Sequence, residues 1–150
     1  MSEPLWIPRE ERISGSRIKE FQRQVGIDGS YMELHSYSLK NKEKFWSHLW
    51  DYCGVIGEKG ERILVDEDKI PGAQFFPDAK INFAENLLRY NDDRLALVSV
   101  LENGSRRTLS YRQLGAKVKA LSVWMENSGV DVGDRVVALL PNVPETIITM

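Results

Sequence analysis

The chain has 150 residues, of which 42% are apolar and 28% charged, and its formal net charge is −2. This balance argues against extensive disorder and offers no basic surface for nucleic acid or an anionic membrane. No apolar run reaches the length of about eighteen residues that spans a membrane, and the start at Met1-Ser2-Glu3-Pro4 lacks the pattern of a signal peptide. We therefore expect a cytoplasmic protein.

A short amphipathic helix is predicted near the start of the chain. Ser14 and Ser16 are candidate caps, and Gly26 supplies a stop signal. Apolar residues recur between them at helical spacing, namely Ile18, Phe21 and Val25.

A second helix is predicted from Leu39 to Cys53, before Gly54. Its aromatic face needs a large partner surface, so it favours a core or interface over a stacking platform for bases. The face consists of Phe45, Trp46, Leu49, Trp50 and Cys53.

Residues 54–77 read as a connector with one short strand near Leu64, because glycine, proline and charges interrupt the pattern. Asn82 is then expected to cap a further helix, with Glu85 three positions later, where its side chain can accept a hydrogen bond from the Asn82 backbone N–H. The helix is expected to end near Tyr90. Its predicted buried stripe is Phe83, Ala84, Leu87 and Leu88.

A β-hairpin is predicted next. Residues 95–101 and 106–109 have strand composition, and Asn103-Gly104 between them tolerates a tight turn. Ser110 and Gln113 then form a capping box, with Leu109 placed to contact Leu114. This helix is expected to close at Ser128-Gly129.

The run from Val136 to Leu140 is continuously apolar, which is typical of a parallel strand covered on both faces. Strand, helix and buried strand together predict a βαβ unit, followed by a helix that starts around Pro144. The fold class is therefore α/β. The sheet is expected to be incomplete in this chain, because such a strand needs neighbours on both sides.

The histidines and the single cysteine offer no clear chemistry. His35 and His48 lack metal ligands at suitable spacing, and we expect His48 to pack beside Trp46 and Trp50. Cys53 has no cationic neighbour in sequence and is expected to be a small buried hydrophobe, and no internal disulfide can form.

Two further segments suggest anion sites but have simpler explanations. Gly129 and Gly133 fit no phosphate-loop pattern, so a helix stop and a turn explain them. Arg106-Arg107 has donors that suit a phosphate, but beside a hairpin turn an exposed edge-strand pair is the default interpretation.

Several segments, taken in order, resemble the acyl- and acetyl-CoA synthetase branch of the adenylate-forming enzymes. The most specific is Phe76–Leu88, and the start, with Pro4–Pro8, Arg12-Ile13 and Phe21, resembles that of acetoacetyl-CoA synthetases. The other matching segments are the aromatic Phe45–Tyr52, Thr108–Leu114 and Gly133–Asn142.

This resemblance implies an ATP-dependent ligase that adenylates acetoacetate and transfers the acyl group to CoA, with Mg²⁺ neutralising phosphate charge. Residues 1–92 would form the amino-terminal cap region, and residues 93–150 the truncated start of the AMP-binding large domain. The family's phosphate loop, ribose-binding aspartate and late lysine do not occur in this sequence. We therefore assign no catalytic, cofactor-binding or metal-binding residue and expect the chain alone to be inactive.

Two alternatives remain open at this point. The parent enzyme would activate another short-chain acid, such as acetate or propionate, if the acyl pocket downstream is built for it. Under the second alternative, the chain is not part of an active enzyme but a non-catalytic interaction module that binds a partner through its unfinished sheet.

Overall fold

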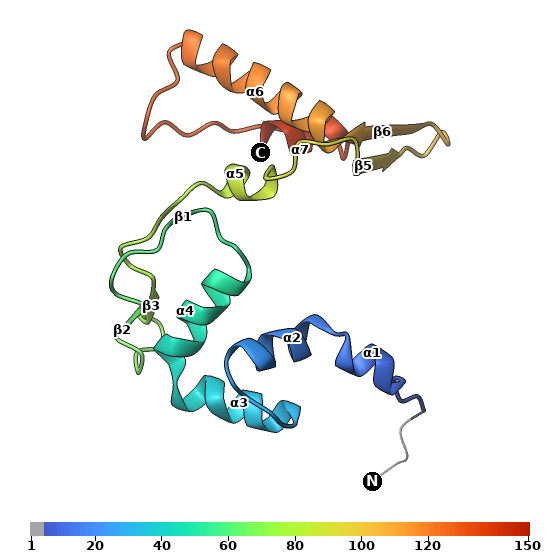
Figure 1. The fold of residues 1–150 in the computed structure, drawn as a ribbon. Coiled ribbons are helices and arrows are strands. Elements are labelled where there is room, and N and C mark those ends of the chain that lie inside the picture. Colours follow the sequence, from blue (N-terminus) through green and yellow to red (C-terminus); the bar gives the residue numbers. More distant parts are fainter. Residues whose placement is uncertain (1–4) are drawn as a thin grey trace. The chain divides into compact units, whose positions relative to one another are not determined.

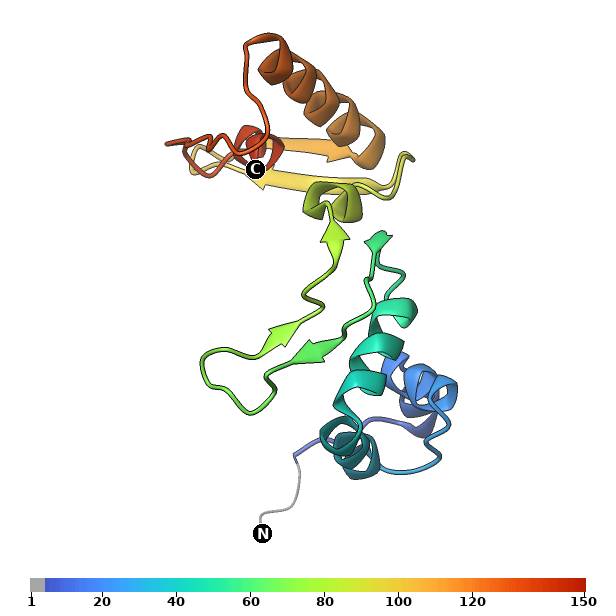
Figure 2. The same cartoon turned by 90° about the vertical axis from the view of Figure 1, so that its left-hand side faces the viewer.

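The computed structural model describes residues 5–150, so the expectations for Met1-Ser2-Glu3-Pro4 lie outside the described residues. The chain forms two compact units. Unit 1 extends to Ile81 and is mainly helical, whereas unit 2, Asn82–Met150, contains a hairpin with helices (Figures 1 and 2).

The helices of unit 1 are α1 (Glu10–Ser14), α2 (Arg17–Gln24), α3 (Tyr31–Lys40) and α4 (Lys42–Tyr52). The predicted helix near the chain start is confirmed as α2. The Ser16 hydroxyl accepts a hydrogen bond from the backbone N–H of Lys19. Gly26, with φ of +71°, ends the helix in a conformation that favours glycine.

The second predicted helix was placed to begin at Leu39, but the structure divides this region. Asn41, with φ of −130° and ψ of 50°, interrupts the helical path, so Leu39 belongs to α3 and α4 begins at Lys42. The prediction also missed α3 itself. Its signal was present in the capping box that Ser30 forms with Glu33.

An aromatic cluster forms the core of unit 1, but the predicted aromatic face is only partly covered, since no residue of α4 is fully buried and Trp46 is exposed. Phe21 is only 5% exposed, and its ring centroid lies 5.7 Å from that of Phe45 and 5.2 Å from that of Tyr52. The Tyr52 hydroxyl also donates to the carbonyl of Arg17 at 2.8 Å. These ring contacts join α2 to α4, with Phe21 buried and Phe45 and Tyr52 half-buried.

The connector after α4 is more regular than predicted, because it forms two short antiparallel ribbons. The predicted strand is present as β2 (Leu64–Val65), which pairs with β3 (Gln74–Phe75). The sequence did not predict β3 or the other ribbon, β1 (Gly57–Glu58) with β4 (Lys80–Ile81). Two-residue strands leave too little period-two pattern to detect.

Two consecutive phenylalanines attach these ribbons to α4. The Trp46 and Phe75 ring centroids are 5.2 Å apart, and those of Trp50 and Phe76 are 4.9 Å apart. Phe76 has φ of +49°, and its N–H donates to the carbonyl of Ile63 at 2.8 Å. The left-handed backbone lets both neighbouring rings reach the same helix.

Unit 2 begins with α5 (Phe83–Leu87), and the Asn82 side chain caps it by accepting from the Glu85 N–H at 3.0 Å. The helix is shorter than predicted, ending before Leu88. The predicted buried stripe is also wrong in part. Phe83 and Leu87 lie four positions apart on an exposed face, whereas Ala84 and Leu88 are half-buried.

The predicted hairpin is confirmed. β5 (Leu95–Val100) pairs antiparallel with β6 (Arg106–Ser110), and Gly104 has φ of +77° in the turn. The helix α6 (Tyr111–Asn127) follows at once through the expected Ser110–Gln113 capping box and lies across the hairpin (Figures 1 and 2).

The predicted strand at Val136–Leu140 is not formed. Val137 is 92% exposed and Leu139 100%, and the segment has no ladder partner among the described residues. A β-strand needs a neighbouring strand to accept and donate its backbone hydrogen bonds. The strands β5 and β6 pair only with each other, so neither provides these bonds for residues 136–140. The α/β class holds as mixed helices and small sheets, but the third element of the predicted βαβ unit stays unpaired.

The chain continues into α7 (Pro144–Thr149), which confirms the predicted helix start. Pro144 occupies its first turn and is buried. Proline suits this position because the first N–H groups of a helix have no acceptor within it. The helix lies beside α6 and the hairpin (Figure 1).

The Ser110 cap predicts a measurable stability effect. Replacing Ser110 with Ala removes the acceptor for the Gln113 N–H and should lower the free energy of opening of α6 by about 1 kcal/mol. Amide hydrogen exchange of α6 measures this. Ser105→Ala, at an exposed position in the hairpin turn, serves as the control, and equal effects from the two variants would contradict the capping role.

Candidate functional site

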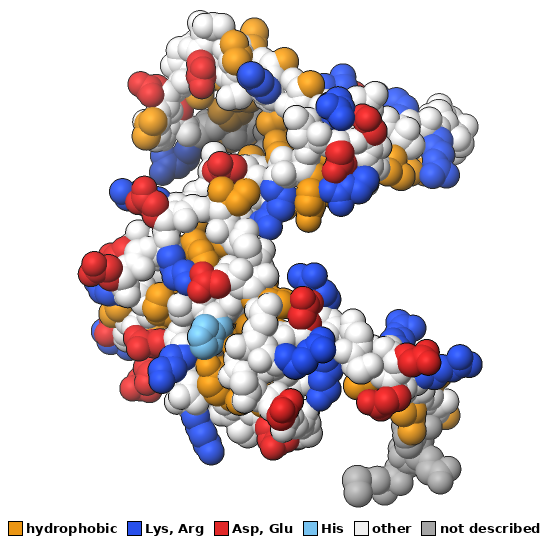
Figure 3. Space-filling model, in the orientation of Figure 1, with side chains coloured by type: hydrophobic (Ala, Val, Ile, Leu, Met, Phe, Trp, Pro, Cys, Tyr) orange, Lys and Arg blue, Asp and Glu red, His pale blue; other side chains and the backbone are white. Residues whose placement is uncertain are grey.

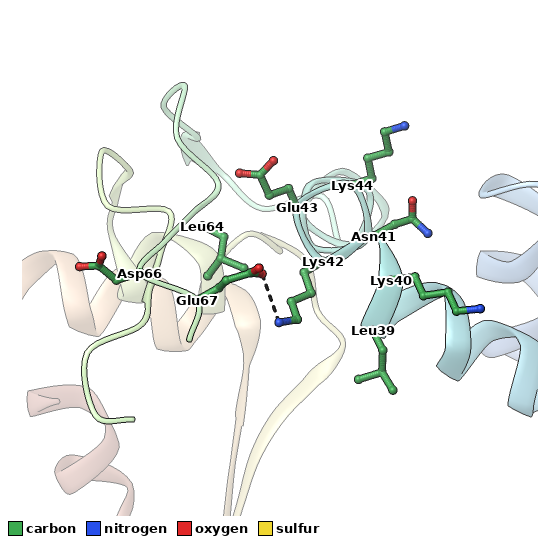
Figure 4. A pocket seen from close by; sticks show the side chains of 9 residues that line it. All are labelled: Leu39, Lys40, Asn41, Lys42, Glu43, Lys44, Leu64, Asp66 and Glu67. Carbon is green, nitrogen blue, oxygen red and sulfur yellow. Dashed lines mark ion pairs between the residues drawn. The ribbon is translucent and has the colours of Figure 1, made fainter. Parts of the chain in front are cut away.

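A polar cavity of about 400 Å³ lies in unit 1, where α3 gives way to α4 opposite β2. In Figure 4 the Lys42 and Glu67 side chains face each other, with 3.1 Å between Nζ and Oε2, while Lys40 and Lys44 extend away. The cavity therefore favours neither an anion nor a cation, since its charges balance. Its charged lining residues are Lys40, Lys42, Lys44, Glu43, Asp66 and Glu67.

A second cavity of unit 1 is apolar. It measures about 300 Å³ and lies between α2, α3 and α4, where Phe21, Leu34 and Leu49 line it. His35 lies at this groove and stacks on Tyr31 with ring centroids 6.3 Å apart. The mainly apolar lining can hold an apolar group, and polar side chains also reach the groove from Arg17, His35 and Tyr52.

The structure places His48 and Cys53 differently from the prediction. His48 is exposed, and its Nδ1 lies 3.3 Å from the Tyr37 hydroxyl. A residue two positions from Trp46 and from Trp50 is turned by about 200° and cannot share their face. Cys53 is also exposed, because the helix ends at Tyr52 and the chain leaves the aromatic face there.

The arginine pair of β6 does not form a phosphate clamp in this structure. Arg106 and Arg107 are exposed, as expected of an edge strand. Arg107 donates from Nη1 and Nη2 to the two carboxylate oxygens of Glu145, at 2.9 and 2.7 Å. This paired bond lowers the pKa of Glu145 and raises that of Arg107.

The glycines after α6 have the conformations predicted for a stop and a turn. Gly129 has φ of +88° and Gly133 of +96°. The N–H of Val130 donates back to the carbonyl of Met125 at 3.1 Å, which closes the helix.

Sequence reasoning missed the longer-range polar contacts. Lys59 Nζ lies 2.6 Å from Asp51 Oδ1 and 3.1 Å from Ser47 Oγ, and Arg62 forms a forked ion pair with Asp78. Because the partners are eight or more positions apart, no local spacing rule points to them. The Arg62 guanidinium lowers the pKa of Asp78 by hydrogen bonding.

No three His, Cys, Asp or Glu side chains of residues 5–150 come together to bind a metal ion. Within the same range, no helix is both long and apolar enough to cross a bilayer. On the face drawn in Figure 3, charges of both signs are interspersed over each unit.

Two protein families match successive parts of this chain. The family described as "Acetyl-coenzyme A synthetase N-terminus" matches residues 31–87, and the "AMP-binding enzyme" family matches residues 83–150. A solved acetoacetyl-CoA synthetase from Streptomyces lividans superposes with a TM-score of 0.89 at 32% identity, over 99% of this chain and 24% of that one. The chain is thus similar first to the acetyl-coenzyme A synthetase N-terminus family and then to the AMP-binding enzymes.

Two curated synthetases are similar to most of this chain. The acetoacetyl-coenzyme A synthetase of Rhizobium meliloti (strain 1021) is 40% identical over 98% of this chain and 23% of its own length. The malonamoyl-CoA synthetase vrtB of Penicillium aethiopicum is 30% identical over 81% of this chain and 18% of its own. The chain thus spans about a quarter or less of these relatives and is homologous to their amino-terminal part.

The Arg107–Glu145 pair predicts a pH effect in unit 2. Because folding lowers the pKa of Glu145, the pair stabilises α7 above the usual glutamate pKa, and this is lost as pH falls through the lowered value. In Arg107→Gln, an NMR titration of the Glu145 carboxyl should move its midpoint up toward the usual value. Arg106→Gln is the matched control, and an unchanged midpoint in Arg107→Gln would refute the assignment.

Proposed function

We propose that this chain forms the amino-terminal part of an ATP-dependent acetoacetate–CoA ligase. The observation that carries the proposal is the 40% identity with the Rhizobium meliloti enzyme over 98% of the chain. The superposition on the Streptomyces lividans acetoacetyl-CoA synthetase, which covers 99% of this chain, agrees with it.

The proposed reaction has two steps. A carboxylate oxygen of acetoacetate attacks the α-phosphorus of ATP, which forms an acyl-adenylate and releases pyrophosphate. The CoA thiol then attacks the acyl carbon, and AMP leaves as the thioester forms. Both steps bring anionic groups together, so they need cationic side chains and a metal ion around the phosphates.

We place that chemistry outside this chain. The described residues offer no group of ligands for Mg²⁺, so no step is assigned through the metal here. Arg107, a guanidinium suited to phosphate, is engaged by Glu145. The proposed contribution of residues 1–150 is therefore structural, and the chain alone should release no pyrophosphate from ATP with acetoacetate and CoA.

The proposed organisation has two parts, with residues 1–92 as the cap region and residues 93–150 as the start of the AMP-binding domain. The two matching families meet at residues 83–87, and the compact units meet at Ile81 and Asn82, which supports a boundary in this part of the chain. We also propose a cytoplasmic setting, in line with a single cysteine and no disulfide.

A second carboxylate is favoured by one specific observation, the 30% identity with a malonamoyl-CoA synthetase. Malonamate carries an amide where acetoacetate carries a ketone, so a site built for one can reject the other only through its hydrogen bonds. Because we place the acyl pocket outside this chain, the two assignments differ in which relative's remaining part this chain should fit better, and not in a substrate contact that it makes itself.

Two hybrid enzymes test the proposal. In each, this chain replaces the matching amino-terminal part of the Rhizobium meliloti or the Penicillium aethiopicum relative. The acetoacetyl hybrid should keep kcat/KM for acetoacetate-dependent pyrophosphate release within about tenfold of its parent, a loss of up to 1.4 kcal/mol in transition-state stabilisation. The malonamoyl hybrid should lose more.

Each hybrid is compared with its own parent in the same assay, and circular dichroism checks that it is folded. A folded acetoacetyl hybrid without pyrophosphate release would refute the proposed function. A malonamoyl hybrid that keeps more of its parent's activity than the acetoacetyl hybrid would transfer the assignment to the second carboxylate.

A further inference from the structure

The loop that joins β5 to β6 is short and closed by backbone hydrogen bonds. The N–H of Gly104 donates to the carbonyl of Leu101 at 2.9 Å, and the N–H of Leu101 donates to the carbonyl of Ser105 at 3.0 Å. Gly104 has φ of +77°. These bonds and the left-handed glycine match a three-residue hairpin loop, in which a turn is followed by a bulge. Asn103 therefore lies directly before the glycine that forms the bulge.

The side-chain amide of Asn103 is held against the peptide that follows it. Its Oδ1 accepts a hydrogen bond from the N–H of Ser105 at 3.0 Å, the local bond that asparagine makes to the backbone two residues on. Because this bond spans the peptide between the two residues, it keeps Cγ near the Gly104 nitrogen. The bond also withdraws electron density from Cγ, which favours attack on that carbon.

Asn103 is the only asparagine of the sequence that is followed by glycine. A side chain on the following residue would obstruct ring closure, and glycine also leaves the backbone free to rotate into position. Residues 102–105 are all exposed, so water and hydroxide reach the site. The Gly104 N–H must leave the Leu101 carbonyl before it reacts, and an exposed hydrogen bond at a loop tip opens at little cost in free energy.

We propose that Asn103 is a site of spontaneous deamidation, at which the Gly104 nitrogen displaces the side-chain amide as ammonia. Hydroxide removes the proton from the Gly104 nitrogen, which then forms a bond to Cγ. The bond from Cγ to Nδ2 breaks, and ammonia leaves after taking up a proton from water. Water then opens the cyclic succinimide at either carbonyl, which gives aspartate or isoaspartate. One water molecule is consumed for each ammonia released, and no oxidant takes part.

The two products differ in their effect on the hairpin. Every reacting atom belongs to residues 103 and 104 or to water, so the reaction needs no partner and is independent of the ligase assignment. In isoaspartate the main chain passes through Cβ, which adds one backbone atom to the loop. Because loop length fixes the register of a hairpin, the pairing of Val100 with Arg106 beside the loop is lost first. Aspartate keeps the original backbone and the acceptor for Ser105.

The test follows residue 103 by peptide mass spectrometry while the full chain is incubated in mildly alkaline buffer. The same chain unfolded in urea sets the time scale, namely the time in which half of its Asn103 converts. Over that time the folded chain should show the mass gain of an amide-to-acid exchange at residue 103. This gain should be at least about tenfold faster than at Asn127, which corresponds to about 1.4 kcal/mol in activation free energy. Electron-transfer fragmentation should detect isoaspartate as well as aspartate.

Asn127 is the internal control, because it is also exposed and precedes a small residue, but the N–H of Ser128 donates to two carbonyls of α6. Asn103→Gln is the matched variant. It keeps an exposed amide but needs a larger ring, so the mass gain at residue 103 should fall at least about tenfold. Asn103→Asp supplies the aspartate reference. Hydrogen exchange of β5 and β6 should be faster in the isoaspartate form than in Asn103→Asp, and circular dichroism verifies folding.

Three results would overturn the inference. In the first, Asn103 stays intact in the folded chain while it converts in the unfolded chain, which would show that the loop protects it. In the second, Asn103 and Asn127 convert at equal rates. In the third, aspartate forms without isoaspartate, because direct hydrolysis of the side chain gives aspartate alone.

Discussion

The backbone ladder between β5 and β6 is the interaction on which the rest of unit 2 depends. It aligns Leu97 with Leu109 and Val100 with Arg106, and β6 runs directly into α6. The N–H of Tyr111 donates to the carbonyl of Arg94 at 3.0 Å, which fixes the start of α6 to the start of β5. Helix α7 then lies against elements whose positions are already set.

Side chains strengthen this junction. The Arg94 guanidinium lies over the Tyr90 ring at 4.1 Å and bonds both carboxylate oxygens of Asp92. Arg112, in the first turn of α6, pairs with Asp93 at 3.0 Å. Asp92 is half-buried and the other groups are exposed, so each pair contributes little alone, but together they restrict the conformation of the chain that enters β5 and α6.

Unit 1 is held differently, through rings and a few buried polar bonds. Gln22 is nearly fully buried, and its amide nitrogen donates to the carbonyls of Gly29 and Ser30 at 3.2 Å each. These hydrogen bonds join α2 to the start of α3, in addition to the apolar side chains between the two helices.

Local signals made most helices and the hairpin predictable from sequence. Ser16, Asn82 and Ser110 each cap the helix that follows, because a cap depends only on residues three positions apart. The strand at Val136–Leu140 failed because its formation depends on partners, which composition does not reveal. The Arg107–Glu145 pair was equally invisible, since its members lie 38 positions apart.

The left-handed backbone at Phe76 links two opposing energies at one residue, the cost of a positive φ and the gain from packing its ring. A non-glycine residue there is disfavoured by about 1 kcal/mol or more, while its ring gains packing against Trp50. Glycine would relax the main chain but forfeit the aromatic anchor, and a β-branched residue would lose on both counts. Sequence drift at this one position is therefore confined to side chains that tolerate the turn and still reach α4.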